Sequence, residues 1–126
     1  MTDLRKILLV DDDPDIRELL SAILERFDFP YIMAASPEEA REAVQNAGDE
    51  ITDILIDYTL PGATNGIQLA DEIKETLPEA EITITSGYSQ SMTEPGISEK
   101  GYNFLSKPFS PQEFLQILET SDCSTR

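Results

Sequence analysis

The stretch LLVDDDPD, residues 8–15, joins an apolar run to three consecutive aspartates. The apolar part is continuous instead of alternating with polar residues, which is typical of a strand buried on both faces of a sheet. Asp13 followed by Pro14 has the pattern of a helix N-cap with proline at the first helical position. The stretch therefore predicts a buried strand that ends in acidic residues and leads directly into a helix.

The same strand-then-helix pattern recurs along the chain. Capping boxes at 36–39 and 110–113 indicate where two helices begin. Apolar residues at helical spacing predict helices at 16–27, 40–47 and 67–77. Between them lie strand-like runs at 6–10, 31–34, 53–57, 81–86 and 102–106. Such alternation predicts an α/β fold, a doubly wound parallel sheet of five strands in the flavodoxin-like order 2-1-3-4-5 with helices on both faces. Only the segment 89–101 breaks the pattern, because Pro95 and Gly96 favour a short or broken helix there.

Length and composition narrow the classes of protein. With 126 residues and 40% hydrophobic residues, we expect residues 1–126 to form a single domain with a core at about 5–120 and a polar tail at 121–126. A net charge of −16 argues against nucleic acid or an anionic membrane as a direct ligand. No apolar run reaches the roughly 18 residues of a membrane span, and MTDLRK lacks the apolar core of a signal peptide, so we expect a cytoplasmic protein.

Residue types that are missing or rare exclude further chemistry. The sequence has no histidine, which excludes histidine as a base or metal ligand of this chain. Its one cysteine, Cys123, cannot form an internal disulfide.

Polar residues stand where the predicted strands end. Asp11 and Asp12 follow the first strand, Asp57 ends the third, Ser86 ends the fourth and Lys107 ends the fifth. In an open α/β sheet, ligands bind beyond the carboxyl ends of the strands. Because the first and third strands are neighbours in the predicted order, the three carboxylates meet at one edge of the sheet.

Such a cluster needs a counter-charge. Two carboxylates roughly 5 Å apart repel by about 3 kcal/mol at an effective dielectric constant near 20. Protonation of one acid relieves the repulsion, and so does a divalent cation; an all-oxygen ligand set favours Mg²⁺, with Mn²⁺ as the second choice. A metal and Lys107 facing an aspartate suit phosphoryl transfer to that aspartate, and Asp57, which stands alone, is the candidate nucleophile.

Four motifs together resemble the receiver domain of response regulators in two-component signalling. ILLVDDDPDIRELL, DILIDYTLPG, TSGYS and FLSKPF occur in the order and at the spacing of that family, over nearly the whole chain. The resemblance implies that Asp57 accepts a phosphoryl group from a phosphohistidine on a histidine kinase or a histidine phosphotransfer protein. It also implies a monomer or weak dimer that is a signalling domain and not an enzyme, apart from catalysing its own phosphorylation and dephosphorylation.

The resemblance assigns metal ligands. Asp12 and Asp57 would bind Mg²⁺ directly, Asp11 would bind it through water, and the backbone carbonyl of Thr59 would be a further ligand.

The resemblance also assigns phosphoryl-binding and switch residues. Ser86 and Lys107 would bind the phosphoryl group, Phe104 occupies the aromatic switch position, and the bond before Pro108 would be cis. Phe104 lacks a hydroxyl, so a switch there would work by packing. Tyr88 is either a surface aromatic or a gate over the site. Plainer interpretations are a turn hydroxyl for Ser86 and a core residue for Phe104.

The loop PGATNG is one residue longer than the commonest form, and with TSGYS it looks most like receivers found on hybrid sensor histidine kinases. Both a stand-alone regulator and a domain of such a kinase therefore remain open.

Two other function classes compete with the signalling domain. Asp11 and Asp13 after the first strand resemble the motif of haloacid dehalogenase-like phosphatases, in which Asp11 would be the nucleophile. The third hypothesis is a binding module that works without phosphorylation.

Overall fold

The computed structural model describes residues 5–87, 101–107 and 109–124. In it, five parallel strands form one sheet in the order β2-β1-β3-β4-β5, which confirms the predicted fold class and strand order. The strands are β1 (Ile7–Val10), β2 (Tyr31–Ala34), β3 (Asp53–Asp57), β4 (Glu81–Gly87) and β5 (Asn103–Lys107). The described helices are α1 (Pro14–Arg26), α2 (Pro37–Ala47), α3 (Gly66–Thr76) and α5 (Pro111–Ser124), with a 3₁₀ turn at Gly48–Glu50.

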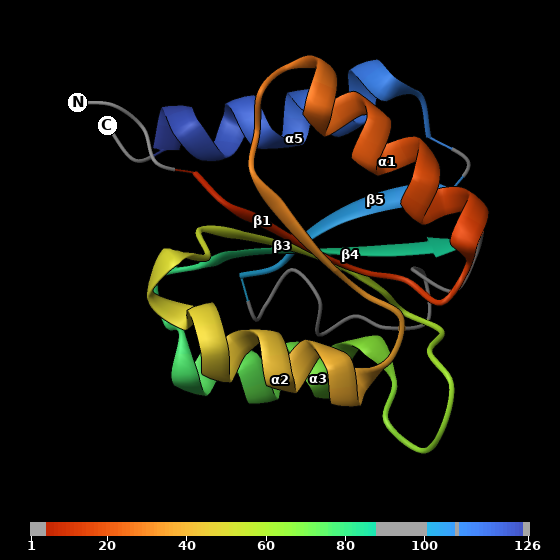
Figure 1. The fold of residues 1–126 in the computed structure, drawn as a ribbon, viewed down its shortest axis with the longest axis vertical. Helices are drawn as coiled ribbons and strands as arrows, with labels where there is room; N and C mark the ends of the chain where they lie inside the picture. Colours follow the sequence, from red (N-terminus) through yellow and green to blue (C-terminus); the bar gives the residue numbers. More distant parts are fainter. Residues whose placement is uncertain (1–4, 88–100, 108, 125–126) are drawn as a thin grey trace.

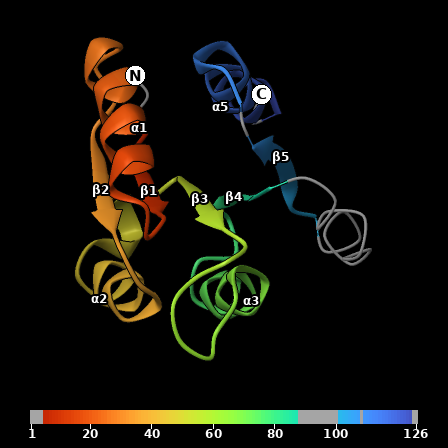
Figure 2. The ribbon, with the colours of Figure 1, turned by 90° about the vertical axis from the view of Figure 1, so that its right-hand side faces the viewer.

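Helices cover both faces of the sheet. Figure 1 shows α1 and α5 on one face and α2 and α3 on the other, and the view along the strands in Figure 2 separates the three layers. Side chains of β1 alternate between two cores: Leu8 and Val10 lie in one cluster with residues of α2 and α3, whereas Ile7 and Leu9 lie in the other with residues of α1 and α5. Because both faces of the sheet are buried, the strands have continuous apolar runs in the sequence.

Helix caps form where the sequence predicts them. The Asp13 carboxylate accepts a hydrogen bond from Asp15 N at 2.9 Å, with Pro14 at the first helical position. Ser36 caps α2, and Ser110 and Glu113 form the reciprocal capping box of α5. The capping box of α3, made by Asn65 and Gln68, was not predicted, because asparagine in a Gly- and Pro-rich loop reads equally well as a turn.

One boundary differs from the prediction. The β5 strand ends at Lys107, as expected, but α5 continues to Ser124, so part of the expected tail at 121–126 is helical. Of the predicted break at 89–101, only residue 101 lies within the described residues. No helix in the described ranges has both the length and the hydropathy needed to cross a bilayer.

The end of α1 contains the one described non-glycine residue with a positive φ, Asp28 at 62°. Asp28 N donates to the Glu25 carbonyl at 3.2 Å and Phe29 N donates to the Leu24 carbonyl at 2.9 Å. These two bonds are those of a Schellman motif, in which glycine is the usual residue at the left-handed position. Aspartate there bears the steric cost of its Cβ and places a negative charge at the negative end of the helix dipole.

We predict that Asp28→Gly stabilises the protein by about 0.5–1 kcal/mol, since relief of the left-handed strain exceeds the added entropy of the unfolded chain. Urea denaturation measures the change. Asp15→Gly, in the first turn of the same helix, should destabilise. Equal or lower stability of Asp28→Gly would contradict the assigned strain.

Candidate functional site

The parallel register brings the polar strand ends together. Val10 is the partner of Ile56, so Asp11 and Asp57 leave neighbouring strands at the same level. On the other side, Asp57 is the partner of Thr85, and Gly87 is the partner of Lys107. The sheet thus delivers residues from four strands to one edge.

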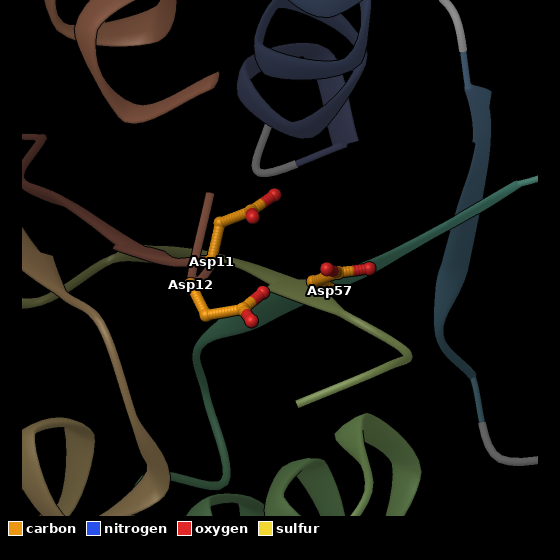
Figure 3. Close-up of side chains that lie close together, drawn as sticks. All are labelled: Asp11, Asp12 and Asp57. Atoms are coloured by element: carbon orange, nitrogen blue, oxygen red, sulfur yellow. The ribbon is translucent and has the colours of Figure 1, made fainter. Parts of the chain in front are cut away.

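Three carboxylates form the centre of this edge. Figure 3 shows Asp11 and Asp12 after β1 beside Asp57 at the end of β3. One oxygen of each lies within 4.8 Å of the others. Asp11 and Asp57 are buried, with 4% and 8% of their surface exposed, whereas Asp12 is exposed. An all-carboxylate set that is open to water on one side suits a hard cation such as Mg²⁺, which keeps several water ligands.

Lys107 places a cation between the two buried acids. Its Nζ lies 3.1 Å from Asp11 Oδ2 and 3.4 Å from Asp57 Oδ2. Burial lowers the pKa of Lys107, but the charges of Asp11 and Asp57 outweigh burial and the net pKa lies above its usual value. Lys107 is therefore protonated at neutral pH and bridges the two buried acids.

The Asp57 carboxyl binds its proton more tightly than an ordinary aspartate does. Burial, followed by the charge of Asp11, raises its pKa from 3.8 to about 6, and Lys107 and the Thr59 N–H offset only part of this. Thr59 N donates to Asp57 Oδ1 at 3.4 Å. At pH 7 Asp57 is mostly ionised, but its ionisation costs more free energy than that of an ordinary aspartate.

Gly66, the first residue of α3, lies directly against the backbone of Asp57. A Cβ built on Gly66 would stand 2.3 Å from the Asp57 carbonyl oxygen and 2.7 Å from Tyr58 Cα. Gly66 N also donates to the Tyr58 carbonyl at 2.8 Å. This close approach holds the strand end that carries Asp57. It is not predictable from the sequence, because a glycine at the start of a helix has no single meaning.

The predicted switch residues lie on the neighbouring strands β4 and β5. Ser86 is buried at the end of β4, and its Oγ makes a long contact of 3.4 Å with the Gly87 carbonyl. Phe104, on β5, is partly buried and packs against the core cluster on the α2–α3 face. Two residues earlier, Tyr102 Oη donates to Asp71 Oδ1 at 2.6 Å and ties the start of β5 to α3.

Two predicted features fall outside the described residues: the cis bond before Pro108 and the position of Tyr88.

Comparison with known proteins identifies the class. A family model for the response regulator receiver domain matches residues 7–119, and the chain belongs to this family. It is 30% identical to the phosphate regulon transcriptional regulatory protein PhoB of Pseudomonas aeruginosa over 118 residues, which cover 91% of this chain and 50% of PhoB. The chain therefore spans half the length of that curated relative.

Solved structures of receiver domains have the same fold as this chain. The receiver domain of NtrX from Brucella abortus superposes with a TM-score of 0.83 at 29% identity and covers 91% of this chain and 96% of that one. A CheY-like receiver domain protein from Methanospirillum hungatei superposes with a TM-score of 0.85 at 26% identity and covers 95% of each chain. The resemblance inferred from the four motifs is thus confirmed, while the likeness to receivers of hybrid kinases stays a prediction.

The alternative functions are not favoured. In the phosphatase hypothesis Asp13 would act beside Asp11, but the Asp13 carboxylate caps α1 and is exposed. A binding module without phosphorylation does not account for three acids gathered around a protonated lysine.

We predict that Asp57→Asn stabilises the metal-free protein at pH 7 and not at pH 4. The folded-state pKa of about 6 lies above the unfolded value of 3.8, so Asp57 favours the folded state at low pH and loses that contribution as pH rises from about 4 to 6. The full shift corresponds to about 3 kcal/mol, and water at the rim screens part of it, so we expect a gain of about 1–2 kcal/mol. Urea denaturation with EDTA at both pH values measures it, and a gain independent of pH would contradict the raised pKa.

We also predict that Gly66→Ala destabilises the protein by at least about 2 kcal/mol, because the added methyl group overlaps backbone of a central strand that cannot move aside. Gly48→Ala is the matched control. Its Cβ would meet only side-chain atoms, the nearest at 3.3 Å, in a right-handed helical conformation. The control should change the free energy of unfolding by less than about 0.5 kcal/mol.

Proposed function

We propose that this chain is a phosphoacceptor of a two-component phosphorelay and that Asp57 receives the phosphoryl group. The donor would be a phosphohistidine on a histidine kinase or a histidine phosphotransfer protein, since this chain has no histidine of its own. The observation that carries the proposal is the meeting of Asp11, Asp12 and Asp57 within 4.8 Å, with Lys107 bridging two of them.

In the proposed transfer, an Asp57 carboxylate oxygen attacks phosphorus. A P–O bond to Asp57 forms and the P–N bond of phosphohistidine breaks, with its electron pair left on the ring nitrogen. The imidazole leaves as the neutral base when its other ring nitrogen already carries a proton. Asp57 must be ionised to attack, and its pKa of about 6 leaves it mostly ionised at neutral pH. A raised pKa also makes the carboxylate more basic than an ordinary aspartate, which favours nucleophilic attack.

The transferring group carries negative charge into an acidic site, so cations decide whether the reaction proceeds. Lys107 is placed to pair with a phosphoryl oxygen on Asp57, because its Nζ already lies 3.4 Å from Asp57 Oδ2. Asp12 and Asp57 would hold Mg²⁺ directly and Asp11 through water, with the Thr59 carbonyl as a further ligand. When bound, Mg²⁺ supplies positive charge to the phosphoryl oxygens.

Phosphorylation would then shift a two-state equilibrium. A phosphoryl group on Asp57 offers acceptor oxygens to the hydroxyl of Ser86, which lies buried on the adjacent strand. Movement of Ser86 toward it would open space for Phe104, the residue on β5 that is partly buried against the core. A few kcal/mol of differential contact suffices for such a shift. The chain then acts as a signalling domain that catalyses only its own phosphorylation and dephosphorylation.

The proposal predicts that acetyl phosphate with Mg²⁺ adds one phosphoryl group to the protein and that Asp57→Asn abolishes the addition. Intact-mass spectrometry and a phosphate-affinity gel measure it. Excess EDTA should reduce the addition to background, because the metal neutralises the acidic site.

Asp15→Asn is the matched control: Asp15 is an exposed aspartate of the neighbouring first helical turn, and it should be labelled like the wild type. Labelling of Asp57→Asn at the wild-type site and rate would refute the assignment. Hydrolysis of a phosphate monoester that is lost in Asp11→Asn and kept in Asp57→Asn would instead support the phosphatase.

A further inference from the structure

Arg17 contacts the turn that carries the two acids after β1, and the proposed function gives it no role. It lies in the second turn of α1, and its Nη1 donates to the carbonyl oxygen of Asp11 at 2.7 Å. The side chain is partly buried, and the space around it is lined by Leu20, Leu55 and Phe109. The guanidinium thus reaches back from the helix, past apolar side chains, to the peptide unit that joins Asp11 to Asp12.

That peptide decides where the acids point. The Asp11 carbonyl belongs to the same planar unit as the Asp12 nitrogen, so a bond to this oxygen restricts the rotations that aim both side chains. The Asp11 side chain is held separately, since its Oδ1 accepts from Asp13 N at 2.9 Å. Arg17 N also donates to the Asp13 carbonyl at 3.1 Å, so the residue joins both ends of the turn to the helix.

The charge of Arg17 and its position have opposite effects on a metal at this site. Lys107 makes the ion pairs with Asp11 and Asp57, whereas the Arg17 bond is to a backbone oxygen. If Arg17 were only one more cation near the acids, its removal would strengthen binding of Mg²⁺ by removing repulsion. If it positions the acids, its removal would weaken binding, as is usual for groups that orient metal ligands.

We propose that Arg17 is a positioning residue for the metal site: by clamping the Asp11 carbonyl it holds the β1–α1 turn in the conformation that binds Mg²⁺. The proposal rests on the proposed function, because it takes Asp11 and Asp12 as metal ligands. It makes the affinity for Mg²⁺ depend on the packing of α1 against the sheet.

The test compares Mg²⁺ affinity in wild type, Arg17→Met and Arg26→Met. Methionine keeps an apolar stem of similar length and removes both the donors and the charge. MgCl₂ titrations followed by tyrosine fluorescence and by the rise in Tm give the Kd. We expect the Kd of Arg17→Met to be about tenfold higher than that of the wild type. Arg26→Met should not change the Kd. Arg26 is exposed and lies nine positions beyond Arg17 in α1, about 13 Å further along the helix axis.

An unchanged or lower Kd in Arg17→Met would overturn the proposal. If Arg17→Met fails to fold without Mg²⁺, Arg17→Lys replaces it. Lysine keeps the charge on a stem one bond shorter, so the Kd should still rise, and a wild-type Kd would overturn the proposal. A wild type that does not bind Mg²⁺ would refute the metal site of the proposed function as well, whereas wild-type binding with no effect of Arg17→Met refutes this inference alone.

Discussion

The burial of the Asp57 carboxylate beside that of Asp11 is the constraint on which the rest of the site depends. Both carboxylates are buried at one edge of the sheet, and the Nζ of Lys107, from a strand two places away from β3, lies within 3.4 Å of each. Burial and, after it, the charge of Asp11 raise the pKa of Asp57 to about 6, because the one ammonium of Lys107 offsets only part of their effect. A cation held by these acids would therefore relieve part of the cost of ionising Asp57.

The scaffold keeps these charges together through backbone contacts. The α3 helix begins on Gly66, whose missing side chain lets it approach the Asp57 carbonyl, and α1 reaches the Asp11 carbonyl through Arg17. The two helices lie on opposite faces of the sheet, so each acid is held from a different layer. A packed sheet of this kind does not relax to separate the charges, so the electrostatic cost of ionising Asp57 persists in the folded protein.

Prediction from the sequence succeeded where local patterns are strong. Continuous apolar runs gave the strands, and Asp13–Pro14, Ser36 and Ser110 marked helix starts that the structure confirms. It failed where one residue has several local meanings: Asn65 as a cap, Asp28 in a left-handed turn and Gly66 in a close approach. The end of α5 was also missed, since a polar ending does not by itself stop a helix.

The sequence by itself determined the family, the order of the strands and the set of acidic residues that follow them, because strand ends in a parallel sheet meet at one edge whatever the details of packing. Only the tertiary structure decided how those residues interact. The distances from Lys107 to the acids, the burial of Asp57 and the bond from Arg17 to the Asp11 carbonyl depend on how β5 and α1 pack. Electrostatic energies depend on the distance between charges and on how far water is excluded, and neither can be derived from the sequence alone.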